Sequence, residues 1–104
     1  MAIVLCKVRT QLIVDEGFLK PNTSTWHGWK IDNINVWWFH VVPHPKNFYW
    51  PRTIQIDKTQ AITTSNGVCY LRAHVTNPDP PVPNWSWSAP DGCYYRLYIA
   101  SAAP

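Results

Sequence analysis

Several features that would assign the chain to a broad class are missing from its sequence. No apolar run approaches the roughly 20 residues that a transmembrane helix needs, so we expect no membrane span. Ten prolines are scattered through the chain without a heptad pattern, which excludes a coiled coil. Charged residues are scarce at 14%, but hydrophobic residues reach 46%, which excludes an intrinsically disordered chain.

Cysteine, glycine and acidic residues are too few or too dispersed to predict a disulfide framework, a phosphate-binding loop or a catalytic pair of carboxylates. The three cysteines are an odd number and form no disulfide framework, although Cys69 and Cys93 could pair if their strands were neighbours. The four glycines are isolated and form no phosphate-binding loop. The six acidic residues fall mainly in expected loops or at strand ends, where no pair stands out for acid–base catalysis. We therefore expect a non-enzymatic protein without a metal or cofactor.

Positive charge is weak and spread along the chain. Nine Lys and Arg residues against six Asp and Glu give a formal net charge of +3. These cations occur singly between Lys7 and Arg96 and form no basic stripe, so nucleic acid is an unlikely partner. The N-terminus lacks the basic and long apolar regions of a signal peptide. We expect a cytoplasmic protein, or one released by a non-classical route.

Alternating β-branched and aromatic segments dominate the chain, and no window shows helical periodicity. Strands are expected over residues 2–14, 30–42, 52–57, 59–64, 68–76 and 93–100. Polar loops are expected over 15–29 and, with five of the ten prolines, over 77–92. We predict a single all-β domain over residues 1–104: an antiparallel β-sandwich of six or seven strands, immunoglobulin-like, fibronectin-like or of a similar small type.

Alternation within these strands predicts which residues face the core. In the two strands that end the chain, odd-numbered residues such as Ala73, Val75, Leu97 and Ile99 are expected inward. Even-numbered residues are expected inward in the strands over 2–14, 30–42 and 52–57. The second half of the 30–42 strand could be covered on both faces, because Trp37, Phe39 and Val41 stand on its other face.

Tryptophan is the most abundant chemical signal, with seven residues in 104. A core of this size does not need seven indoles, so some of them are expected to bind a ligand. Outside the strands they fall in three groups, in the two polar loops and in the turn after residue 45. The aromatic candidates are Trp26, Trp29, Tyr49, Trp50, Trp85 and Trp87.

Indole rings surrounded by small polar residues suit sugars, which offer an apolar C–H face and a rim of hydroxyl groups. Amide and carboxylate groups near these rings could bind the hydroxyl groups, and the candidates are Asn22, Asp32, Asn84 and Asp91. In composition and architecture the pattern resembles small β-sandwich lectins and carbohydrate-binding modules. The leading hypothesis is a small non-catalytic lectin whose partners are glycans and which forms a homo-oligomer.

The alternative hypothesis is a protein-interaction or self-assembly module. If the strands over 68–76 and 93–100 are neighbours, they place Tyr70, Arg72 and His74 beside Tyr94, Arg96 and Tyr98. Tyrosine and arginine are typical anchors of protein interfaces. Such a face could also bind a glycan, and Arg72, Arg96 and Tyr94 are therefore further candidate ligand contacts.

Overall fold

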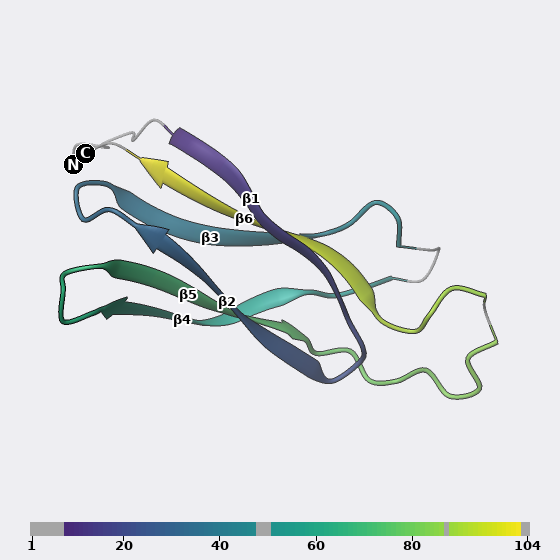
Figure 1. The fold of residues 1–104 in the computed structure, drawn as a ribbon. Helices are drawn as coiled ribbons and strands as arrows, with labels where there is room; N and C mark the ends of the chain where they lie inside the picture. Colours follow the sequence, from purple (N-terminus) through teal and green to yellow (C-terminus); the bar gives the residue numbers. More distant parts are fainter. Residues whose placement is uncertain (1–7, 48–50, 87, 103–104) are drawn as a thin grey trace, which may run out of the picture.

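A computed structural model describes residues 8–47, 51–86 and 88–102, which form strands, turns and loops (Figure 1). The strands are β1 (Val8–Leu19), β2 (Thr23–Ile31), β3 (Val36–Pro43), β4 (Gln55–Thr63), β5 (Cys69–Asn77) and β6 (Cys93–Ala102). All pairings are antiparallel and make two three-stranded sheets, ordered β1-β6-β3 and β2-β5-β4. The described residues include no helix of the length and hydrophobicity that would cross a membrane. The predicted all-β class and antiparallel pairing are confirmed.

The core lies between the two sheets and takes side chains from both. Leu97 and Ile99 of the central strand β6 have no exposed surface, and neither do Ala73 and Val75 of the central strand β5. Alternation correctly predicted these inward faces because a central strand has neighbours on both sides and the opposite sheet beneath it. The full cluster of buried core residues is Leu19, Phe39, Ala73, Val75, Tyr95, Leu97 and Ile99.

The prediction of a polar loop over residues 15–29 is wrong. β1 continues to Leu19 and β2 begins at Thr23, so the connection is a short turn. In this turn Asn22 has a φ of 57°, and the Thr23 amide donates a hydrogen bond of 3.2 Å to the Lys20 carbonyl. The segment is polar because β1 and β2 are edge strands with one face toward solvent, which is compatible with a strand.

The prediction of one strand over residues 30–42 is also wrong, because Asp32 turns the chain. Its carboxylate accepts hydrogen bonds of 3.1 and 3.0 Å from the amides of Ile34 and Asn35. These hydrogen bonds, the one from the Asn35 amide first, lower the pKa of Asp32. The turn sends β3 to the opposite sheet and leaves Ile34, expected inward, 74% exposed.

β3 buries the odd-numbered face, which the sequence offered as a second covered face, and exposes part of the even-numbered face expected inward. Phe39 is 8% exposed, and Trp37 and Val41 pack against the core. Val36 and Val42, expected inward, are 58% and 39% exposed. Both faces of this strand are apolar, so alternation alone does not determine which face is buried.

Bulges change two other predicted strands. The strands expected over 52–57 and 59–64 are parts of one strand, β4, which has a register shift at Asp57. β1 has two register shifts, and Leu12, expected inward, is 42% exposed. Gly67 lies in the turn between β4 and β5 with a φ of 82°, which suits the tight turn of this hairpin.

The strand order separates two groups of residues that the sequence left as candidate neighbours. β5 and β6 belong to different sheets. Cys69 and Cys93 are accordingly free thiols. The Tyr/Arg face expected from these two strands does not form, because Arg72 lies in one sheet while Tyr94 and Arg96 lie in the other.

Candidate functional site

The predicted aromatic residues that the structure describes do not converge on one site. Tyr49, Trp50 and Trp87 lie outside the described residues. Trp26 and Trp29 belong to strand β2 instead of a loop, and they point to opposite sides of its sheet. Trp29 packs against the core, which gives it a structural role.

Trp85 and Asp91 hold the proline-rich loop after β5. The Trp85 indole nitrogen donates a hydrogen bond of 2.6 Å to the Ala89 carbonyl, and the Arg52 guanidinium lies 4.7 Å from the indole ring. Asp91 pairs with Arg52 at 3.2 Å and accepts a hydrogen bond of 2.9 Å from the Val82 amide. These contacts occupy both residues in folding the loop. Arg52 gave no signal in the sequence, because its role depends on contacts across the fold.

Two other predicted polar residues are turn residues. Asn84 has a φ of 55°, a backbone conformation that asparagine tolerates, and it is exposed. The Asn22 amide donates a hydrogen bond of 3.1 Å to the Asp79 carbonyl and so ties the β1–β2 turn to the loop that follows β5.

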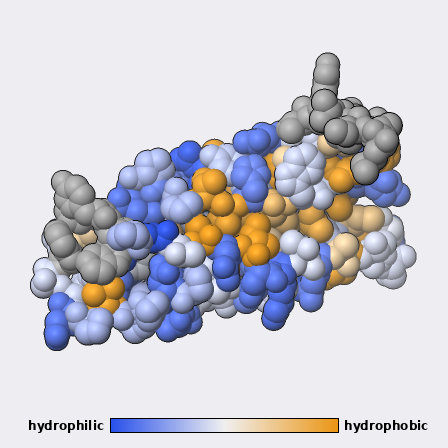
Figure 2. All heavy atoms as spheres, turned by 180° about the vertical axis from the view of Figure 1, so that it is seen from behind, coloured by the Kyte–Doolittle hydropathy of each residue, from blue (hydrophilic) through white to orange (hydrophobic). Residues whose placement is uncertain are grey.

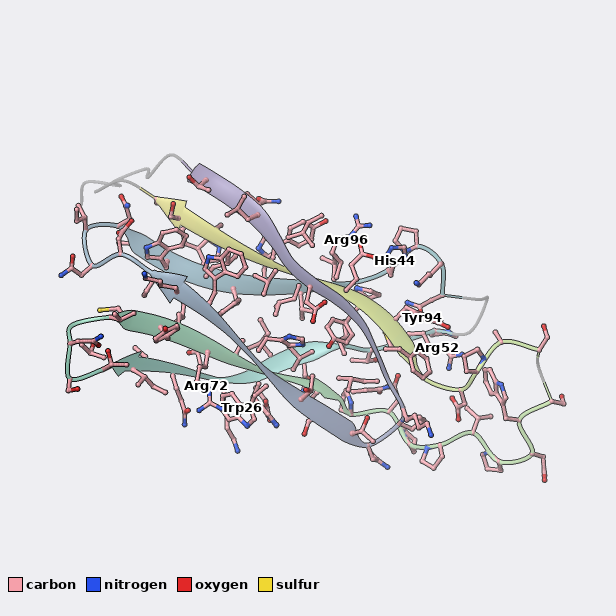
Figure 3. All side chains as sticks on the ribbon, viewed as in Figure 1. Trp26, His44, Arg52, Arg72, Tyr94 and Arg96 are labelled. Atoms are coloured by element: carbon pink, nitrogen blue, oxygen red, sulfur yellow. The ribbon has the colours of Figure 1, made fainter. Side chains whose placement is uncertain are left out.

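Arg96 and Tyr94 lie on the outer face of the β1-β6-β3 sheet, each within a cluster of its own. Arg96 donates a hydrogen bond of 2.7 Å to Glu16, and its hydrogen bonds, to Tyr98 first, raise the pKa of its guanidinium. The Tyr94 ring contacts Lys46, whose ammonium nitrogen is 4.3 Å from the ring centroid, and Phe18 at 4.7 Å between centroids. Figure 3 shows Arg96 and Tyr94 in the opposite layer from Trp26 and Arg72.

Trp26 and Arg72 meet on the outer face of the β2-β5-β4 sheet, as Figure 3 shows. The Arg72 guanidinium carbon lies 4.5 Å from the centre of the Trp26 ring. The His74 ring lies 4.7 Å from the same indole at an angle of 44°. Arg72 donates a hydrogen bond of 3.3 Å to Gln60, and His74 pairs with Asp57 at 2.6 Å. We name these five side chains the Trp26 platform.

Strand register explains why the platform forms here. Trp26 pairs with His74 across β2 and β5, and Gly28 pairs with Arg72. Since glycine has no side chain, the Arg72 chain has room to extend over the indole; an alanine Cβ at position 28 would lie 3.7 Å from the Arg72 Cγ. The bulge in β4 contains Asp57, and the hydrogen bond from His74 lowers the pKa of this carboxyl group.

A second polar group joins the two sheets. The His27 Nε2 atom lies 2.7 Å from the Tyr95 hydroxyl, and its Nδ1 atom lies 3.4 Å from the Asp15 carboxylate. Burial raises the pKa of Tyr95 to about 12 and lowers the pKa of His27. Tyr95 is 2% exposed, and burial disfavours the charged phenolate form of its side chain. Tyr95 is therefore suited to a structural hydrogen bond and not to nucleophilic chemistry.

The described residues enclose no pocket, and they contain no group of three or more His, Cys, Asp or Glu residues placed to hold a metal ion. Comparison of the chain with protein-family models, curated proteins and solved structures found no match.

Proposed function

We propose that the protein is a non-catalytic carbohydrate-binding protein whose binding surface is the Trp26 platform. The observation that carries the proposal is the contact of one half-buried indole with a guanidinium and an imidazole on a solvent-facing sheet. An amide and a carboxylate stand directly beside these groups.

The chemistry of the platform matches that of a pyranose ring. Aromatic surface contacts the apolar C–H face of a sugar through dispersion and the electron-rich ring. The guanidinium of Arg72 donates hydrogen bonds, and the oxygen atoms of Gln60 and Asp57 accept them, so both hydrogen-bonding roles of a sugar hydroxyl find partners. Antiparallel pairing places these groups on three adjacent strands, where successive sugar units of an extended chain could reach them.

The charge of this face favours an acidic glycan. Lys30 pairs with Tyr70, and Lys58 pairs with His74, so both lysines share the outer face with Arg72. Among the described residues of this face, Asp57 is the one carboxylate against these three cations. Uronic acid or sulfate groups would therefore be attracted, and their binding should weaken as salt concentration rises.

A glycan array with three proteins tests the proposal. Wild-type protein should bind acidic oligosaccharides selectively, and Trp26→Ala should reduce the affinity at least about tenfold, which corresponds to about 1.4 kcal/mol of lost contact. Trp85→Ala is the matched control, because it makes the same substitution in the proline-rich loop, and it should retain binding. Circular dichroism establishes that each variant is folded. Equal binding by Trp26→Ala and wild type, or no glycan bound by wild type, would refute the proposal.

We further infer that the two sheets form a β-sandwich of the jelly-roll kind instead of the immunoglobulin or fibronectin kind. In an immunoglobulin domain the first two strands share a sheet. Here the chain changes sheet at each of its first three connections, and the first and last strands are neighbours, an arrangement that favours a jelly roll. Jelly rolls include lectin domains among other classes, so this fold is compatible with glycan binding but does not by itself specify it.

The alternative function, self-assembly, no longer rests on a Tyr/Arg face, because that face is divided between two sheets. A different observation, the free edge of β3, favours association of the chain with itself.

A further inference from the structure

Strand β3 forms an edge of its sheet and, apart from Pro43 at its end, lacks the features that usually protect an edge. Among the described residues, it pairs with β6 on one side and with no strand on the other. Such an edge leaves a row of backbone N–H and C=O groups able to pair with another strand. Proteins usually block this pairing with charged side chains, bulges or short strands.

The other three edge strands have such features. β1 contains two register shifts, and β4 contains the bulge at Asp57 followed directly by Lys58. β2 contains Gly28 and Lys30. By contrast, β3 has eight residues in one uninterrupted register, without a Lys, Arg, Asp or Glu side chain. Among the described strands, β3 is therefore the edge best suited to pairing.

Apolar surface continues from this edge between the two sheets. Figure 2 views the molecule from the side of β3 and β4 and shows apolar residues gathered along its middle, with polar residues on both sides. Val36 and Val42 are exposed at the two ends of β3, and Val41 and Ile56 are only partly buried. An exposed apolar patch beside an open strand edge is typical of an interaction surface.

The sequence of β3 is complementary to itself in antiparallel orientation. Inward-facing residues must meet inward-facing residues in a continuous sheet, and a pairing centred on Phe39 meets this condition. The pairs would be Val36 with Val42, Trp37 with Val41, Trp38 with His40 and Phe39 with Phe39. β-Branched and aromatic cross-strand pairs of this type stabilise sheets.

We propose that β3 is a homodimer interface, at which two copies of the chain pair antiparallel about Phe39 and form one six-stranded sheet. A second copy fits this edge because it supplies an uncharged partner strand with matching residues at all seven positions from Val36 to Val42. One strand pair with its flanking apolar surface is at the small end of specific interfaces, so we expect a dimer that forms in the micromolar concentration range.

The first experiment compares wild-type protein with Val36→Lys/Val42→Lys by sedimentation velocity over a wide range of concentrations. Wild type should shift from monomer to dimer as its concentration rises. The variant should stay monomeric, because the proposed register places like charges opposite each other at both ends of the strand pair. Ile62→Lys, at a residue 41% exposed on the β4 edge, is the matched control and should still dimerise.

Charge reversal tests both the partner and the register. Val36→Glu/Val42→Glu alone should be monomeric, but mixed with the lysine variant it should form a heterodimer, because each Lys then faces a Glu. Circular dichroism checks the folding of each variant. Hydrogen exchange of wild-type protein needs no substitution, and amides of β3 should become more protected at high concentration than at low concentration.

Three results would overturn the proposal: wild type that remains monomeric at every concentration, a dimer that persists in the lysine variant, or β3 amides whose exchange is independent of concentration. If wild type remains monomeric at every concentration, the β3 edge would be available to a strand of a different protein. The test does not depend on glycan binding and can fail or succeed separately from it.

Discussion

Gly17→Ala places a methyl group against the buried phenol of Tyr95. The new Cβ would lie 2.5 Å from the Tyr95 hydroxyl oxygen, 2.6 Å from Cζ and 2.9 Å from Cε1, whereas ordinary contacts are 3.4–4 Å. The ring cannot simply swing away, because it is 2% exposed and its hydroxyl group is hydrogen-bonded to His27 at 2.7 Å. The new methyl group therefore both overpacks the core beside the ring and breaks the hydrogen bond of the hydroxyl group.

The two costs can be added. Overpacking of a core costs about 1–3 kcal/mol, and a lost hydrogen bond costs about 0.5–1.5 kcal/mol. Alanine restricts the unfolded chain and returns about 0.4–1 kcal/mol. We therefore expect Gly17→Ala to lower the free energy of unfolding by about 2 kcal/mol, which corresponds to a fall in Tm of about 10 °C for a domain of this size.

Urea unfolding followed by tryptophan fluorescence measures this loss, and a double-mutant cycle identifies its cause. Tyr95→Leu removes all three atoms that the new Cβ would contact, so Gly17→Ala should cost much less in that background. If Gly17→Ala is as stable as wild type, or if it costs the same with Leu at position 95, then contact with Tyr95 does not explain the glycine.

Two further predictions concern ionisable side chains that are wholly or partly buried, His27 and the Arg52–Asp91 pair. Because burial lowers the pKa of His27, the unfolded chain binds a proton at this residue more readily than the folded chain, so stability should fall as pH decreases from about 7 toward the folded-state pKa. Thermal melts of His27→Gln should show a smaller fall in stability over this pH range. An unchanged pH dependence in this variant would contradict the assignment. Asp91→Ala removes the ion-pair partner of Arg52, whose side chain is 6% exposed, and should lower the free energy of unfolding in urea by about 3–5 kcal/mol. The same substitution should make the loop over 78–92 easier to cleave with protease. Stability equal to that of wild type would show that the ion pair does not hold the loop.

The sequence was most informative where one face of a strand is apolar and the other is polar. In β6, odd-numbered residues such as Leu97 alternate with Arg96 and Tyr98, so period two identifies the buried face. In β3 both sets are apolar, and the same rule could not single out the face that is buried. The connection between β2 and β3 was missed because its turn depends on a carboxylate, that of Asp32, binding backbone amides, and not on a Gly or Pro signal.

The sequence pointed to two residues of the Trp26 platform but not to the platform as a unit. Trp26 and Arg72 were both expected to bind ligand, yet from two unrelated surfaces. They meet because β2 and β5 are neighbours in register, and alternation within a single strand contains no information on strand order. Gln60 joins them for the same reason, through the pairing of β4 with β5.

Dimerisation through β3 would also determine the direction in which the two Trp26 platforms face. Antiparallel pairing of identical strands within one sheet requires a two-fold axis perpendicular to that sheet. Both β2-β5-β4 sheets would then pack on the same side of the six-stranded sheet, with their outer faces pointing away from it in one direction. Two open binding surfaces on one side of a dimer can contact the same glycan-covered surface together, so modest affinity at each platform would be multiplied by the high effective concentration of the second. An open sheet face without a pocket is a weak single site, and pairing at the β3 edge would compensate for that weakness.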